Sequence, residues 1–155
     1  MNRIFMIRHG QPGRETPLSE HGELQAQGAA EELVRVHGVE GGESTTVLSS
    51  NVPRALRTAE IIGEEIGSLV LPSVAIARIG FSSSLVGSLD EHLSGALDEA
   101  EHDADGLNDL VVVAHEPIVA SVASLATEDE MHFVGHCEIF EYEPGTWRNP
   151  DSSSY

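Results

Sequence analysis

Two arginines and two histidines in this sequence each follow a segment that has the character of a buried β-strand. They are Arg8, His9, Arg54 and His115. A guanidinium group offers forked donors to phosphoryl oxygens, and a neutral imidazole can act as a nucleophile near pH 7. The chain of 155 residues contains eight basic residues, all of them arginine. A concentration of cationic and donor groups at strand ends therefore predicts a phosphate site.

The chemistry that suits these residue types is phosphoryl transfer. His9 is the predicted nucleophile and would form a phospho-enzyme. Arg8 and Arg54 would stabilise charge on the equatorial oxygens, and His115, if protonated, would add another donor. Backbone N–H groups at the start of the helix near Arg54 would be further donors to the phosphoryl oxygens. Isolated residues of these types are often salt-bridge or core residues, so the prediction rests on their combination.

Strand-like and helix-like segments alternate along the chain. Residues 3–7 and 45–48 and the continuous apolar run after 108 are predicted strands, with helices between them. This order favours a three-layer α/β sandwich with a mostly parallel central sheet. The carboxyl ends of parallel strands share one edge, where such folds bind their ligands. We expect one domain over residues 1–147 and a loose tail over 148–155.

Two helices are expected to carry or position the candidate site. The first has Ser19 as its N-cap and an apolar stripe made of four residues, Leu24, Ala29, Leu33 and Val36. The second starts at Pro53, which suits a first helical turn. Arg57 lies three residues after Arg54 on the same helical face. It either extends the pocket or pairs with Glu60, and the sequence leaves both readings open.

The charge of the chain limits its partners. Acidic residues outnumber basic ones 26 to 8, which gives a formal net charge of −18. Such a field repels nucleic acid and anionic membranes, so we predict neither as a partner. A single cysteine excludes an intrachain disulfide, and the sequence shows neither a signal-peptide core nor a membrane-length apolar run. We expect a cytoplasmic protein whose substrate is a phosphorylated small molecule or a phosphoprotein; its oligomeric state stays open.

Four segments, in the same order as in a known family, carry a closer resemblance. They are FMIRHGQ, PLSEHGELQAQGA, SSNVPRALRTAE and VVVAHEP, and they span residues 5–117. The sequence resembles the histidine phosphatase superfamily, also called phosphoglycerate mutase-like, and is most similar to its compact SixA-type branch of phosphohistidine phosphatases. The resemblance implies that His9 is phosphorylated and that Arg8, Arg54 and His115 form the phosphate pocket. It implies no metal and no organic cofactor. We add four residues as substrate-binding candidates: Gly10, Gln11, Ser50 and Glu116.

The sequence departs from the larger members of this family in its general acid. Those members place a glutamate between the second arginine and the second histidine, and no residue here matches it cleanly. Asp90 and Glu91 are the candidates in that stretch. A missing acid would favour labile donors such as phosphohistidine, because their leaving group departs more easily. Two alternatives remain, namely a phosphatase of small phosphomonoesters and a non-catalytic regulatory domain that binds phosphate.

Two histidines near the end of the chain raise the question of a metal. His132 and His136 would share one face of a strand, next to Cys137. No third ligand has the spacing that zinc sites usually show, so we predict no metal there. Cys137 is expected to be a small buried residue of the last strand.

Overall fold

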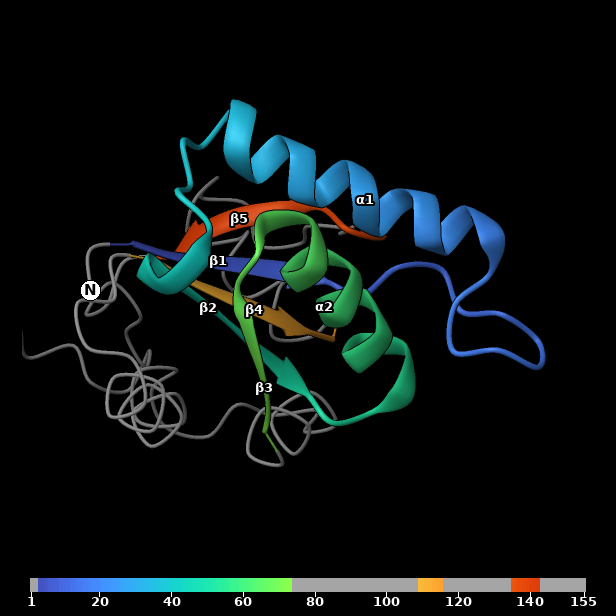
Figure 1. Ribbon diagram of the computed structural model, residues 1–155. Helices are drawn as coiled ribbons and strands as arrows, with labels where there is room; N and C mark the ends of the chain where they lie inside the picture. Colours follow the sequence, from blue (N-terminus) through green and yellow to red (C-terminus); the bar gives the residue numbers. More distant parts are fainter. Residues whose placement is uncertain (1–2, 74–108, 116–134, 143–155) are drawn as a thin grey trace, which may run out of the picture.

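The computed structural model describes residues 3–73, 109–115 and 135–142, which form one sheet and two helices (Figure 1). The strands are β1 (Arg3–Arg8), β2 (Thr45–Ser50), β3 (Leu69–Ser73), β4 (Asp109–Ala114) and β5 (Ile139–Tyr142). The helices are α1 (Glu20–Arg35) and α2 (Pro53–Ile66), with a short 3-10 turn η1 (Gly42–Ser44). The strand order is β3-β2-β4-β1-β5, and all neighbouring pairs are parallel except β1 with β5. The predicted α/β fold with a mostly parallel sheet is confirmed.

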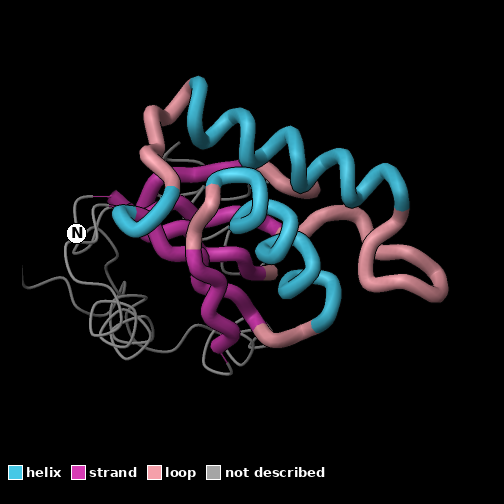
Figure 2. The backbone as a smooth tube through the Cα atoms, in the orientation of Figure 1, coloured by secondary structure: helices cyan, strands magenta, loops and turns pink. Residues whose placement is uncertain are grey.

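Strands β1 and β4 are buried on both faces of the sheet. Phe5 and Val111 belong to the core beneath α1 and α2, while Ile4 and Val112 point to the other face and are also fully buried. Continuous apolar runs are what parallel strands require when both faces are covered. Figure 2 shows both described helices on one side of the sheet. The sequence also predicts helices over 89–102 and 117–126, and both ranges lie outside the described residues.

Helix α1 begins as the sequence predicts but buries a different face. The Ser19 hydroxyl accepts a hydrogen bond from the Gly22 N–H at 3.0 Å, which confirms the N-cap. The expected stripe is half wrong, because Leu24 and Val36 are 62% and 71% exposed. Small residues form the buried face instead, together with one leucine: Gly22, Ala26, Ala29, Ala30 and Leu33. Side chains of that size let the helix approach the sheet and α2 closely.

Helix α2 follows β2 directly and sets the position of Arg54. Pro53 occupies its first turn, and Gly67 ends it in the left-handed conformation with φ of 70°. Ala59 and Ile62 are fully buried against the sheet. Pro72 lies within β3, which is an edge strand, where a residue without an N–H is tolerated. Neither described helix has the length and apolar character needed to cross a membrane.

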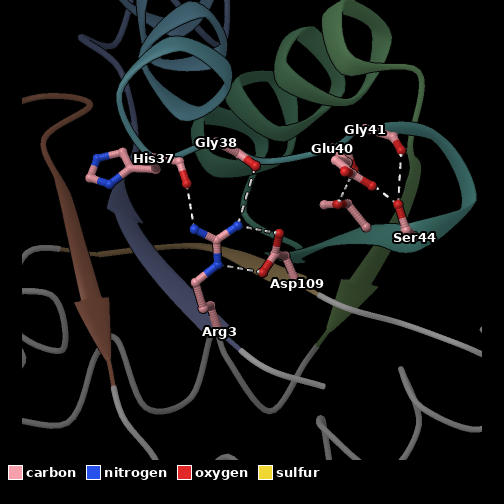
Figure 3. A network of polar contacts seen from close by, with 8 residues as sticks. Arg3, His37, Gly38, Glu40, Gly41, Ser44 and Asp109 are labelled. Atoms are coloured by element: carbon pink, nitrogen blue, oxygen red, sulfur yellow. Dashed lines mark hydrogen bonds and ion pairs between the residues drawn. The ribbon is translucent and has the colours of Figure 1, made fainter.

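Arg3 ties together the edge of the sheet opposite the candidate site (Figure 3). Its guanidinium donates twice to the buried Asp109 carboxylate, with both distances at 2.9 Å. It also donates to the carbonyl oxygens of His37 and Gly38, which follow the end of α1. The forked pair joins β1 to β4, and the carbonyl contacts hold α1 against them. This cation therefore has a structural place at the amino ends of the strands.

Two glycines of α1 should respond to alanine in opposite directions. A Cβ at Gly22 would overlap the backbone carbonyl oxygen of Gln11, whereas a Cβ at Gly28 would meet nothing within 4 Å. Gly22→Ala is expected to cost roughly 1–3 kcal/mol of unfolding free energy. Gly28→Ala should stabilise the protein by about 0.5–1 kcal/mol, since alanine is the better helix former. Urea unfolding of both variants measures the difference, and equal midpoints would contradict the close approach at Gly22.

Candidate functional site

Three parallel strands end at the same edge of the sheet and carry the candidate residues there. The register pairs Arg8 with Ala114 and Ser49 with Val113. The residues that follow β1 and β4, His9 and His115, therefore lie side by side, with ring centroids 5.5 Å apart. Arg54 reaches the same place from the first turn of α2. The structure thus brings together the predicted residues from three strand ends.

Hydrogen bonds at both ring nitrogens fix the tautomer of His9. Its Nδ1 lies 2.8 Å from the carbonyl oxygen of Gly10, and its Nε2 lies 3.2 Å from the Nε of Arg54. A carbonyl oxygen can only accept and a guanidinium can only donate. The proton is therefore assigned to Nδ1, and the lone pair at Nε2 faces the arginine. That lone pair is the one that is available for nucleophilic attack.

The surroundings of His9 keep its imidazole neutral. The residue is buried, with 6% of its surface exposed. Burial lowers the pKa of His9 from its usual value to about 4. The bond to the Gly10 carbonyl acts in the other direction, and the charges of Arg54 and Arg8 and the His115 ring add to the lowering. A neutral imidazole is available as a nucleophile throughout the physiological range.

His115 is held by Ser50 at the end of the neighbouring strand. The Ser50 Oγ lies 2.9 Å from the Nε2 of His115 and accepts a hydrogen bond from the Val52 N–H at 3.2 Å. Both residues are buried. Burial lowers the pKa of His115, and the charge of Arg54 adds to this. The imidazole is therefore neutral without a substrate, and an approaching phosphate dianion would favour its protonation. Ser50 contacts the histidine directly.

Thr58 connects the loop after β1 to α2, and our sequence reading did not single it out. Its Oγ1 accepts a hydrogen bond from the Gly10 N–H at 3.0 Å and donates to the Arg54 carbonyl at 2.8 Å. Thr58 lies four residues after Arg54, so the two share one helical face, which is the signal that could have found it. Both backbone groups of Gly10 are engaged, its oxygen by His9 and its N–H by Thr58. Gly10 thus contributes by holding the histidine.

Other candidate residues lie elsewhere or fall outside the described part of the chain. Gln11 is exposed and its Oε1 accepts a hydrogen bond from the Ser19 hydroxyl at 3.0 Å, so its contact is with the start of α1. Arg57 pairs with Glu23 of α1 at 3.8 Å, and not with Glu60, which is one of the two alternatives that the sequence leaves open. Three predicted residues lie outside the described residues: Asp90, Glu91 and Glu116.

The turn before β5 adds a third histidine to the site. The ring centroid of His136 lies 5.8 Å from that of His9. Cys137 is buried, as predicted, but it precedes β5 and has a left-handed backbone with φ of 61°. Burial raises the pKa of its thiol to about 12. His132 lies outside the described residues, and the residues that are described contain no group of three His, Cys, Asp or Glu arranged to hold a metal ion.

Comparison with known proteins relates this site to a family. Residues 4–79 match the model of the histidine phosphatase superfamily, branch 1, and this segment contains Arg8, His9 and Arg54. The N-terminal half of the chain is therefore similar to the histidine phosphatase superfamily. The matched segment includes β1, at whose end Arg8 and His9 lie. No protein of curated function matches the sequence significantly.

Several solved structures share the fold across nearly the whole chain. Mycobacterial glucosyl-3-phosphoglycerate phosphatase in complex with VO3 has a TM-score of 0.60 at 19% identity, and the match covers 96% of each chain. Bacillus stearothermophilus YhfR has a TM-score of 0.60 at 14% identity, with 96% of this chain and 95% of that one covered. An Agrobacterium tumefaciens protein provisionally assigned as phosphohistidine phosphatase SixA has a TM-score of 0.58 at 15% identity, covering 95% and 94%. At these identities the likeness establishes the fold.

Proposed function

We propose that this chain is a phosphatase that forms a covalent phosphohistidine intermediate on Nε2 of His9, without a metal or an organic cofactor. The observation that carries the proposal is the neutral Nε2 lone pair with the Arg54 Nε at 3.2 Å. A nucleophile and a cationic donor for phosphoryl oxygens are thus within reach of one phosphorus atom. The match of residues 4–79 to the histidine phosphatase model supports the same chemistry.

In the first step the phosphoryl group moves from the substrate to His9. When the substrate enters, Arg54 exchanges its contact with Nε2 for the phosphoryl oxygens. The Nε2 lone pair attacks phosphorus, the bond from phosphorus to the leaving atom breaks, and that atom takes the electron pair and then a proton from solvent. The ring becomes cationic at this point, and the Gly10 carbonyl that accepts the Nδ1 proton at 2.8 Å stabilises it. Arg54, Arg8 and His115 stabilise the phosphoryl charge.

In the second step water releases the phosphate. A water oxygen attacks phosphorus, the bond between phosphorus and Nε2 breaks, and its electron pair returns to His9. A proton of the water is lost to solvent. The restored Nε2 lone pair can accept a hydrogen bond from Arg54 again, so the enzyme ends in its starting state.

The proposed substrate is a labile phosphoryl donor such as a phosphohistidine. The sequence offers no clean match to the family's glutamate acid, and a labile donor needs less help to leave. The likeness to the SixA protein of Agrobacterium tumefaciens supports this choice. A second candidate is a small phosphomonoester, and the likeness to the mycobacterial glucosyl-3-phosphoglycerate phosphatase favours it. We propose a cytoplasmic location, which suits a chain with one cysteine and a charge of −18.

Phosphate release from two donors tests the proposal. The purified protein is incubated with a phosphohistidine peptide and with an aryl phosphate, and inorganic phosphate is measured. Release from the peptide at the higher kcat/KM is the expected result. A preference for the ester would move the substrate to the second candidate. The protein could also release no phosphate from either donor while it is folded and still binds phosphate. That result would contradict the phosphatase proposal and favour a non-catalytic regulatory domain.

The phosphatase activity should be lost in acid only at a pH well below the usual pKa of histidine. Because burial lowers the pKa of His9 to about 4, kcat/KM should stay constant on its acidic side down to about pH 4 and then fall tenfold per pH unit. NMR titration of the ring should place the same transition near 4. The fold should weaken at higher pH than the activity falls, between pH 6.5 and 4, since a histidine pKa lowered by folding contributes stability that is full above about 6.5 and lost as the pH falls towards 4. If kcat/KM already began to fall at pH 6.5, burial would not be lowering the pKa of His9.

A further inference from the structure

The turn that precedes β5 is built as a bulge opposite Arg8. The Arg8 N–H donates to the Glu138 carbonyl at 3.4 Å, while the Arg8 carbonyl accepts from the Cys137 N–H at 2.9 Å. Two residues of one strand therefore oppose a single residue of β1. Cys137 has a φ of 61°, in the position of this bulge that glycine usually occupies. Bulges of this kind redirect a side chain beside a site.

Two further hydrogen bonds close the same turn. The Glu138 N–H donates to the Gly135 carbonyl at 3.2 Å, and the Glu138 carboxylate accepts from the Gly135 N–H at 2.7 Å. A left-handed backbone at a residue other than glycine costs about 1–3 kcal/mol and persists where the surroundings impose it. His136 is the residue between Gly135 and the strained Cys137. Its backbone is thus fixed from both sides while its ring is half-buried.

The ring of His136 lies beside His9, on the side opposite His115. In the strand order β4-β1-β5, His115 follows β4 and flanks His9 from one side, and His136 precedes β5 and flanks it from the other. The centroid of the His136 ring is 5.8 Å from that of His9 and tilted by 43°. A phosphoryl group bonded to Nε2 has three equatorial oxygens, and Arg54 approaches from the side of α2. An oxygen that points towards β5 lies on the side from which His136 approaches His9.

We propose that His136 is a further substrate-binding residue, whose imidazole donates a hydrogen bond to the phosphoryl oxygen on the β5 side of His9. This inference rests on the proposed function of His9 as the nucleophile. A donor at this place matters in a chain with 26 acidic and 8 basic residues, because the general field repels a phosphate dianion. The strained turn is then the device that aims the ring at the phosphoryl group.

Binding of orthovanadate and of inorganic phosphate tests this contact without any turnover. The variants are His136→Ala, His136→Phe, which keeps a ring without a donor, and His136→Gln, which keeps a donor without the ring. The φ of His136 is not in the left-handed region, so the turn accepts all three. The control is His37→Gln, a half-buried histidine whose ring packs on Phe5 near the amino end of β1. Calorimetry gives the dissociation constants, and thermal unfolding checks the fold.

Loss of the donor should weaken binding of both anions by about 10-fold to 100-fold, as expected for a hydrogen bond to a charged group. The alanine and phenylalanine variants should lose equally, glutamine should recover part of the loss, and the His37 control should match the parent protein. Retained binding in His136→Phe would show that the ring only packs against His9 and would overturn the proposal. So would unchanged binding in all three variants. Absence of phosphate release by the parent protein would refute the proposed function, while the binding data would still decide on His136.

Discussion

Replacing His9 with asparagine is expected to lower kcat for phosphate release by about 10⁴-fold or more, the scale on which loss of a nucleophile acts in enzymes with covalent intermediates. Asparagine keeps an N–H that can donate to the Gly10 carbonyl, so the loop after β1 retains its contact. It lacks the Nε2 lone pair that faces Arg54. Phosphate release under saturating donor measures the effect, and acid-labile labelling of the parent protein but not of the variant would identify the intermediate.

The asparagine variant should still fold and bind phosphate. Removing a buried imidazole whose pKa is lowered to about 4 also removes a source of acid destabilisation, so the variant should lose less stability than the parent between pH 6.5 and 4. The matched control is His37→Asn at the opposite edge of the sheet, which should keep full turnover. If His9→Asn retained more than one hundredth of the parent kcat, another residue would have to be the nucleophile.

Arg54→Lys should reduce kcat by about 10²-fold to 10³-fold, the range seen when one donor to transition-state charge is removed. Lysine keeps the positive charge but offers a point charge in place of a planar fork, and it has no Nε–H to set against Nε2 of His9. The loss should therefore fall on kcat more than on KM. Steady-state kinetics with the preferred donor separates the two.

Arg35, an arginine on the surface, provides the control for the substitution of Arg54. Arg35 is exposed and pairs with Glu31 along α1 at 2.9 Å. Arg35→Lys should change neither kcat nor KM, because an exposed pair of this kind contributes little. If Arg54→Lys behaved like the control, positive charge alone would be enough at the site, and the fork would have no part in stabilising the transition state.

The parts of the fold that could be predicted are those with a strong local signal. Strands β1 and β4 are continuous apolar runs. The N-cap Ser19 and the first-turn proline Pro53 are chemical signals that act within a single turn. The buried face of α1 could not be predicted as well. Small residues such as Ala26 and Ala30 carry little hydrophobic signal, while Leu24 has a strong one and remains exposed.

The candidate site divides in a similar way. Arg8, His9, Arg54 and His115 could be placed together because parallel strands end at one edge of the sheet. The partner of Arg57 depends on how α1 packs on α2, and no spacing within one helix indicates Glu23. The place of His136 depends on β5 lying antiparallel beside β1 and on a bulge at Cys137. The pairing of β1 with β5 joins residues more than a hundred positions apart, and neither contact leaves a local pattern in the sequence.

The strand order has a consequence for when the active site can exist during synthesis. β4 lies between β1 and β2, so the two N-terminal strands that carry His9 and lead to Arg54 are never hydrogen-bonded neighbours. Residues 3 and 109 face each other across the sheet, which gives the domain a high contact order and slows folding. A ribosome-bound chain that ends before β4 holds three of the four predicted phosphate ligands but lacks the strand that brings them together. Catalytic competence should therefore appear abruptly, when residues 109–115 leave the exit tunnel and insert between the two halves of the sheet.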